Sequence, residues 1–405
     1  MEKSEICSTD MDMKFEAGLN VPARVIVGAD ALEKSRGLLA EYGKKALVVT
    51  GKHVGRSSMM SRLKAVLDRD GVEYAVFDGI TGEPTDAMIA EGVNAYRDSG
   101  CDFCIGLGGG SPLDSAKAIA AMAVNDGEIA DYNGRVIEGK IPNVVAIPTT
   151  AGTGSEATKF TIITDTKRGI KMLLKGDVLL PVLAVVDYTM GIDAPKGVTA
   201  ATGLDALTHA IESYISVKAS AATDRLAADA VRRIMKFLPD AYRSGDNESR
   251  EQMACAALQA GVCINNSSVT VVHGLSRPIG ALFHVPHGIS NAMLLSTCLN
   301  DMLAEAEAKY AALARNIGVA TDGDTDAAAA AAFIAAVENL CRVCDVPTLK
   351  EYGIDEKRFV ESIDKMAADA IASGSPANAP KTYTAADCRR LYLAAFPLYE
   401  IDAIR

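Results

Sequence analysis

The sequence predicts an α/β domain with a parallel sheet in its N-terminal half, followed by an all-helical domain. Short apolar runs bounded by Gly, Pro or Asp alternate with helical stretches in the first half, and from about residue 197 nearly every segment has helical spacing. Strands that alternate with helices of this length favour a parallel sheet covered on both faces. A chain of 405 residues exceeds one ordinary core, so we place the domains at 1–194 and 195–405, with the boundary near Pro195.

The first domain is expected to alternate strands and helices along the chain. Its strands are short apolar runs, and the two segments between the first three strands place their apolar residues at helical spacing. The expected elements are a strand at 45–50, a helix at 59–71, a strand at 73–80, a helix at 85–100, and strands at 103–111, 143–150 and 182–189.

Helical spacing predicts the elements of the second domain. The Ala run at 327–332 resembles a low-complexity tract, but Phe333, Ile334, Val337 and Leu340 continue a helical apolar stripe, so we expect an ordinary helix. The helices expected in this half span 200–216, 224–238, 251–264, 288–303 and 326–341.

Composition excludes several classes of partner. The net charge of −11 argues against a nucleic-acid surface, and no Lys/Arg cluster with interleaved aromatics occurs. No apolar run is long enough to span a bilayer, and the first residues lack an apolar signal core. An odd number of cysteines, nine, fits a reducing compartment. We therefore expect a cytoplasmic protein without nucleic-acid or membrane partners.

A glycine-rich turn, "LGGGSPLDSAKAIA" at 107–120, follows a strand and opens a helix. Glycines let the backbone approach a ligand, and Ser111 with Pro112 suits a helix start. Exposed amides and the positive end of the helix dipole favour a phosphate or pyrophosphate. The pattern is neither G-x-G-x-x-G nor the P-loop, so a purely structural turn is the alternative.

A second polar loop, "IPTTAGTGSEAT" at 147–158, also follows a strand. Loops at the carboxyl ends of parallel strands converge on the ligand crevice, where the hydroxyls of Thr149, Thr150 and Thr153 would bind ribose or phosphate oxygens. Helix capping is the alternative role for such threonines.

Histidines are concentrated in the helical half. Asp205 and His209 lie one helical turn apart and share a helix face, which alone is also explained by a helix-internal hydrogen bond. The block "HGLSRPIGALFHVPHG" adds His273, His284 and His287. Asp205 with three neutral imidazoles makes an N3O ligand set suited to Fe²⁺ or Zn²⁺. We therefore predict a shared metal site.

Several motifs together resemble the iron-containing (group III) alcohol dehydrogenases. They are "FDGITGEPTD", "CDFCIGLGGGSPLDSAKAIA", "IPTTAGTGSEAT", "ATGLDALTHAIESY" and "HVPHGISNAMLL", in this order over almost the whole chain. The resemblance implies an N-terminal dinucleotide-binding α/β domain followed by a helical metal domain, in a homo-oligomer of two or more copies. It also implies NAD(P)-linked hydride transfer between nicotinamide and a small alcohol or aldehyde polarised by Fe²⁺, alternatively Zn²⁺.

The same resemblance assigns individual residues. The implied metal ligands are Asp205, His209, His273 and His287. The implied cofactor-binding residues are Gly109, Gly110, Ser111 and Asp114, with Thr149, Thr150, Thr153 and Lys171 beside them.

One departure from the family pattern concerns the substrate pocket. Many members read HGxxHP where this chain reads "HGLSRP", which places Arg277 one turn after His273. Arginine stays charged and cannot relay a proton, but it pairs well with a carboxylate or sulfonate. With Lys159 as added positive charge, we expect a short aldehyde with an anionic tail, such as a semialdehyde or sulfoaldehyde. Arg277 and His284 are the candidate catalytic residues, and pairing of Arg277 with a protein carboxylate is the alternative.

A second departure concerns the coenzyme. Many NAD-preferring members read VVTD where this chain reads "VVTG". Gly51 removes a carboxylate that would repel a 2′-phosphate, and Lys52 and Arg56 are close in sequence, which favours NADP(H). Glu83 could still bind a ribose diol, which favours NAD(H). Gly51→Asp is expected to shift preference towards NAD(H).

Five alternatives remain. Within the family the enzyme could be a neutral short-chain alcohol or diol dehydrogenase, and a glycerol dehydrogenase-like zinc enzyme or a lyase of the dehydroquinate synthase type shares the architecture. A 2-His-1-carboxylate oxygenase would use similar ligands but leaves the phosphate loop without a purpose. A scaffold protein with a relic site would bind neither metal nor nicotinamide.

Overall fold

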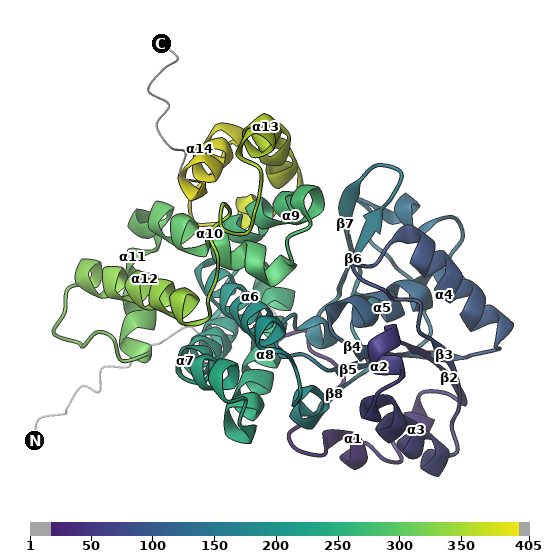
Figure 1. Cartoon of the computed structure of the whole chain (residues 1–405). Helices are drawn as coiled ribbons and strands as arrows, with labels where there is room; N and C mark the ends of the chain where they lie inside the picture. Colours follow the sequence, from purple (N-terminus) through teal and green to yellow (C-terminus); the bar gives the residue numbers. More distant parts are fainter. Residues whose placement is uncertain (1–17, 397–405) are drawn as a thin grey trace, which may run out of the picture.

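The computed structural model describes residues 18–396 as an α/β region followed by a helical region (Figure 1). Six strands form one sheet in the order β1-β8-β5-β4-β2-β3, and all neighbours run parallel. These strands are β1 (Arg24–Val27), β2 (Lys45–Val49), β3 (Glu73–Phe77), β4 (Phe103–Gly108), β5 (Val144–Pro148) and β8 (Leu183–Val186). The α-helices of this region are α1 (Ala31–Lys34), α2 (Lys52–Gly55), α3 (Ser58–Asp70), α4 (Asp86–Asp98) and α5 (Gly110–Val124).

Both faces of the central strands of the sheet are buried, whereas the edge strands β1 and β3 are partly exposed. In β2, Leu47 and Val49 pack in a cluster with α4 and α5, whereas Ala46 and Val48 pack on the other face with α1 and α3. Because successive strand residues point to opposite faces, a strand buried on both sides has no polar alternation. This confirms the parallel α/β sheet that the apolar runs predicted.

A two-stranded antiparallel hairpin was not expected from the sequence. It consists of β6 (Phe160–Asp165) and β7 (Ile170–Lys175), with Phe160 opposite Lys175. Figure 1 places β7 on the side of the α/β region that faces helix α9. The hairpin therefore contributes side chains to the space between the two regions.

The helical region packs around α6. Its helices are α6 (Lys196–Ile215), α7 (Ala221–Arg243), α8 (Asn247–Ser267), α9 (Val271–Phe283), α10 (His287–Asp301), α11 (Leu303–Asn316), α12 (Asp326–Val343), α13 (Glu356–Ala372) and α14 (Ala385–Ala395). Every residue of α6 from 203 to 213 is buried. A helix that is buried all round is a core helix, so its polar residues face other protein groups or a ligand rather than bulk water.

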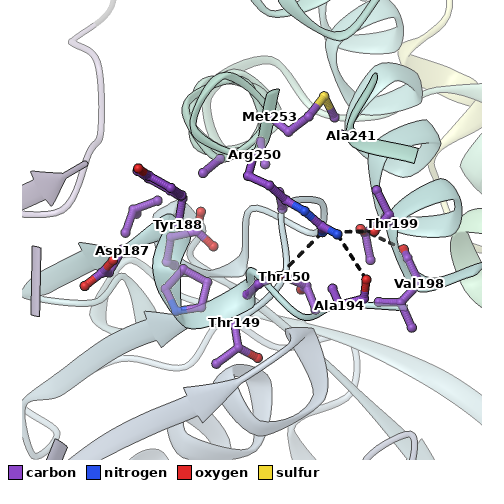
Figure 2. Close-up of a pocket in the computed structure, with 18 residues that line it drawn as sticks. Thr149, Thr150, Asp187, Tyr188, Ala194, Val198, Thr199, Ala241, Arg250 and Met253 are labelled. Atoms are coloured by element: carbon purple, nitrogen blue, oxygen red, sulfur yellow. Dashed lines mark hydrogen bonds between the residues drawn. The ribbon is translucent and has the colours of Figure 1, made fainter. Parts of the chain in front are cut away.

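The junction between the regions is fixed by an arginine of α8. Arg250 donates from Nη1 to Thr199 Oγ1 at 3.0 Å and from Nη2 to the carbonyl of Ala194 at 3.1 Å (Figure 2). These bonds tie α8 to the segment that enters α6. In the part of the chain that the structure describes, no single helix has the length and apolarity to cross a bilayer, although the bent pair α8 and α9 passes on those two criteria.

Candidate active site

A cleft of about 1120 Å³ lies between the two regions. Loops after β3, β4 and β5 form one side, the β6–β7 hairpin contributes to the wall, and α6, α9 and α10 form the other side. The residues named by the sequence analysis that line it are Glu83, Gly110, Ser111, Asp114, Thr153, Lys171, Asp205, His209, His273, Arg277 and His287. The structure thus brings the expected phosphate loop and metal cluster to one cavity.

Three of the four expected metal ligands converge. One ligand atom each from Asp205, His273 and His287 lies within 4.8 Å of the others. Asp205 Oδ1 is 3.5 Å from His273 Nε2 and 3.7 Å from His287 Nε2. His209 Nε2 is 3.8 Å from the same oxygen, and its ring stacks on His273 with 4.6 Å between centroids. One carboxylate oxygen and imidazole nitrogens make a donor set that fits Fe²⁺ or Zn²⁺.

The charge states of these groups suit metal binding. Burial lowers the pKa of His209 to about 4 and, with added repulsion from His273, Lys171 and Arg277, that of His287 to about 3. Burial alone would raise the pKa of Asp205, but the imidazoles around it hold the pKa below its ordinary value. Neutral imidazoles and an ionised carboxylate are the forms that ligate a cation.

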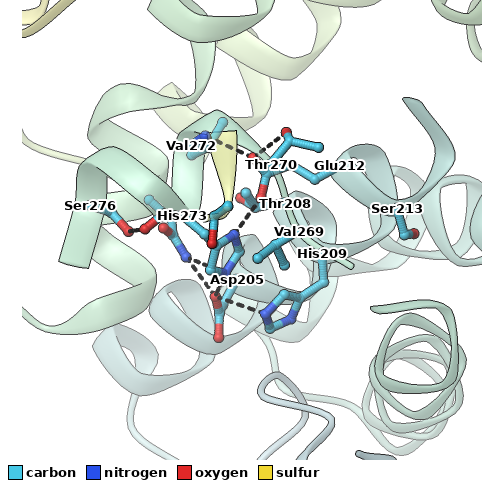
Figure 3. A network of polar contacts seen from close by, with 12 residues as sticks. Asp205, Thr208, His209, Glu212, Ser213, Val269, Thr270, Val272, His273 and Ser276 are labelled. Carbon is cyan, nitrogen blue, oxygen red and sulfur yellow. Dashed lines mark hydrogen bonds and ion pairs between the residues drawn. The ribbon is translucent and has the colours of Figure 1, made fainter. Parts of the chain in front are cut away.

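A buried glutamate orients His273. Glu212 is fully buried and accepts hydrogen bonds from His273 Nδ1 at 2.5 Å, Thr270 Oγ1 at 2.6 Å and the Val272 amide at 2.7 Å (Figure 3). Burial lowers the pKa of His273, but the Glu212 carboxylate outweighs it and raises the pKa overall. Holding the proton on Nδ1 leaves Nε2 free to face the cluster.

The two glycine-rich loops pack against each other. A Cβ on Gly110 would lie 2.8 Å from Thr153 Cγ2, so a side chain does not fit there. The Thr149 amide donates to the Gly108 carbonyl at 2.8 Å. Thr149 and Thr150 line a separate cavity of about 580 Å³ at the domain junction (Figure 2), although Thr150 also lies beside Gly109. Gly110 and Thr153 therefore line the main cleft, and Thr149 and Thr150 do not.

A fully buried lysine of α5 holds the end of the second polar loop. Lys117 Nζ donates to Ser155 Oγ at 2.9 Å, Thr158 Oγ1 at 3.1 Å and the Phe160 carbonyl at 2.9 Å. Asp114 Oδ1 lies 3.8 Å away and accepts from Ser155. Burial lowers the pKa of Lys117 to about 8. Lys117 thus joins α5 to the segment that leads into the hairpin.

The residues expected to bind the coenzyme do not all line the cleft. Glu83 Oε1 is 2.6 Å from Lys171 Nζ, so these two residues pair within the cleft. Gly51 does not line the cleft, and it bridges Gly79. A Cβ on Gly51 would lie 2.8 Å from the Ile80 carbonyl oxygen. A side chain at position 51 would have to displace the Ile80 carbonyl, so Gly51→Asp is expected to disturb the end of β2 instead of only adding a carboxylate beside the coenzyme.

Arg277 lines the cleft without a carboxylate partner among residues 18–396. Its Nη1 donates to Ser375 Oγ at 3.0 Å, and its buried Nε has no hydrogen-bond partner there. Two other expectations differ from the structure. Lys159 pairs with Asp177 at 2.8 Å instead of facing the cleft. His284 is exposed at the end of α9 with φ of 56° and does not reach the cleft, which removes the basis for a catalytic role.

Sequence reasoning missed two buried residues beside the metal cluster, Glu212 and Asn291. The sequence places both on the helix face of a predicted metal ligand. Glu212 follows Asp205 and His209 at i+7 and i+3, and Asn291 follows His287 at i+4. Residues at these spacings share a helix face. Extending each ligand face by one turn would have found them.

Comparisons with known proteins agree with this geometry. The model of the iron-containing alcohol dehydrogenases matches residues 22–188, and the model of the family's C-terminal domain matches residues 199–396. The chain is 34% identical over 376 residues to the NAD-dependent methanol dehydrogenase of Bacillus methanolicus, covering 92% of this chain and 97% of that protein.

Solved structures are similar over nearly the full length. A 1,3-propanediol oxidoreductase superposes with a TM-score of 0.89 at 33% identity, covering 94% of this chain and 99% of that one. The sulfoacetaldehyde reductase of Bifidobacterium kashiwanohense, solved with NAD+, gives 0.83 at 27% identity, covering 93% and 98%. The chain belongs to the iron-containing alcohol dehydrogenase family.

Proposed function

We propose that this protein is a metal-dependent, nicotinamide-linked oxidoreductase that reduces a short aldehyde carrying an anionic tail. The general activity, NAD-linked interconversion of alcohols and aldehydes, follows from family membership. The anionic tail is the more specific proposal. This proposal rests on Arg277, because its side chain lines the cleft beside the metal cluster and lacks a carboxylate partner among the described residues.

The two sides of the cleft would bind different groups, the metal ion and the coenzyme. Asp205, His209, His273 and His287 would hold a divalent ion that supplies Lewis-acid chemistry at the substrate oxygen, while the coenzyme supplies the hydride. The amides at the start of α5, around Gly110, face the cleft and suit the coenzyme's pyrophosphate. This division keeps binding of the coenzyme separate from binding of the metal.

The charge pattern near the cluster favours an anion. Lys171 and Arg277 both lower the pKa of His287, so both positive charges lie close to it. Glu83 pairs with Lys171, so among the described residues that line the cleft Arg277 is the cation without a carboxylate partner. Burial lowers the pKa of Arg277, and the carboxylates of Glu212 and Asp205 offset only part of that effect. A carboxylate or sulfonate would form a charge-assisted, bidentate pair with it.

Arg277→His tests the substrate assignment. We expect kcat/KM for succinic semialdehyde and sulfoacetaldehyde to fall about 100-fold, the loss expected for hydrogen bonds to a charged group. Activity on butanal and propanal should stay the same or rise, since a neutral tail no longer faces a buried cation. Arg358→His, an exposed arginine of α13, is the matched control.

Equal proportional losses on anionic and neutral aldehydes would show that Arg277 has a structural role only. The enzyme would then be better described as a neutral alcohol or diol dehydrogenase.

We further propose that NADP(H) is accepted alongside NAD(H). No side chain at Gly51 can oppose a 2′-phosphate, and exposed Lys52 and Arg56 lie next to it at the end of β2. The KM values of the metal-loaded enzyme for NADPH and NADH should lie within about tenfold of each other, since exposed charges contribute modestly. Complete rejection of NADPH would refute this and point to Glu83 as the selecting group.

A further inference from the structure

The carboxamide of Asn291 lies where the metal ligands converge. Asn291 is fully buried on α10, four residues after His287. Its Nδ2 is 2.8 Å from Asp205 Oδ1, 3.1 Å from His273 Nε2 and 3.4 Å from His287 Nε2. These are the same three atoms that form the expected metal cluster. The amide nitrogen thus faces every converged ligand at once.

The proton positions make this nitrogen a donor. Glu212 holds the proton of His273 on Nδ1, so His273 Nε2 presents a lone pair. The Asp205 carboxylate oxygen, 2.8 Å from the same nitrogen, is also an acceptor. The amide NH₂ therefore satisfies lone pairs of the ligand set.

The carboxamide oxygen is left without a partner. Asn291 Oδ1 is buried and accepts no hydrogen bond within residues 18–396. A buried acceptor without a donor is unfavourable, and nearly all such groups in proteins have partners. A half-turn of the amide exchanges the positions of N and O, which are almost equal in size. That turn would direct the oxygen at the cluster.

We propose that Asn291 is a fifth member of the metal centre, with a different end of its amide used in each state. The NH₂ group donates its two hydrogens to Asp205 and His273, its nearest acceptors, when no ion is bound. When those atoms bind a divalent cation their lone pairs are no longer available to the NH₂, and the amide turns its oxygen to the cation. Carbonyl oxygens are established ligands of divalent metals. The inference rests on the metal site of the proposed function but not on its substrate.

Metal titration of Asn291 variants tests this without substrate or coenzyme. Apo protein is titrated with Co²⁺ against a chromophoric chelator for the wild type, Asn291→Ala and the nearly isosteric Asn291→Leu, which guards against a cavity that prevents folding. We expect both variants to bind Co²⁺ about 10- to 100-fold more weakly. Their Co²⁺ visible bands should intensify, as expected when an oxygen ligand is lost. Asn300→Ala, on the same helix but bonded only to the Ser296 carbonyl, should match the wild type.

Asn291→Asp keeps an oxygen at this position and should restore both affinity and the wild-type band pattern. Unchanged Co²⁺ affinity in the Ala and Leu variants would overturn the proposal. So would weaker binding with an unchanged spectrum, since that would show a structural role alone. A wild type that binds no Co²⁺ would contradict the metal-dependent function itself. Normal Co²⁺ binding by the wild type with unaffected variants would contradict only the role of Asn291.

Discussion

His287→Ala and His273→Ala are expected to abolish metal binding and reduce aldehyde reduction by about 10³-fold or more, the effect of losing several kcal/mol of Lewis-acid assistance. Both imidazoles converge on Asp205 Oδ1 at 3.7 and 3.5 Å. Removing either leaves too few ligands in the converged set. Metal content by elemental analysis and kcat/KM of the reloaded enzymes are the measurements.

The two variants differ in their structural risk. His273→Ala removes a hydrogen-bond donor from the fully buried Glu212, so it also destabilises the helical region. His287 is partly exposed, and its removal is the cleaner test. Nicotinamide binding should persist in both, because the phosphate loop belongs to the other region. His53→Ala, an exposed histidine on α2, is the control. Full activity in metal-stripped His287→Ala would refute metal dependence.

Lys117→Met is expected to destabilise the α/β region by about 3–5 kcal/mol, the usual effect of breaking a buried charged pair. The substitution leaves Asp114 buried without its cation, and it removes donors from Ser155, Thr158 and the Phe160 carbonyl. We expect the unfolding temperature to fall by about 10 °C, measured by circular dichroism.

Lys140→Met, which changes an exposed lysine, should leave the unfolding temperature almost unchanged. The affinity for NADH, measured by fluorescence titration, should also fall in Lys117→Met, because the 147–158 loop, whose Thr153 packs against Gly110, loses its bonds to α5. An unfolding temperature equal to that of the wild type would show that neighbouring groups compensate for the lysine.

Elements with a one-sided or continuous apolar pattern could be predicted from the sequence. Five of the six parallel strands, together with α6, α8 and α12, were expected close to their observed bounds, since burial fixes their pattern, whereas the largely exposed edge strand β1 was not expected. The β6–β7 hairpin was not expected because two of the three buried residues of β6, Thr161 and Asp165, are polar, so its alternation of burial is not an alternation of hydropathy. One helix expected at 288–303 ends at Asp301, and α11 begins at Leu303, because Met302 caps both.

The site was predictable where its residues share one helix face or follow one strand. Asp205 and His209 on α6 and the loop at Gly110 are of this kind. Local spacing cannot show which neighbours a side chain meets in three dimensions. Lys159 adjoins the Thr-rich loop in sequence but pairs with Asp177, and the close approach of the Ile80 carbonyl to Gly51 is visible only in the fold.

The proposed selection of an anionic aldehyde through Arg277 can be tested by comparing two substrates. The test compares kcat/KM of the metal-loaded wild type for succinic semialdehyde and for its neutral methyl ester. It is made once with saturating NADH and once with saturating NADPH. We expect a preference for the anion of about 100-fold. Raised salt should weaken this preference only if the ion pair between Arg277 and the anionic tail is exposed to solvent. Equal values for the two aldehydes, or a preference for the ester, would contradict it.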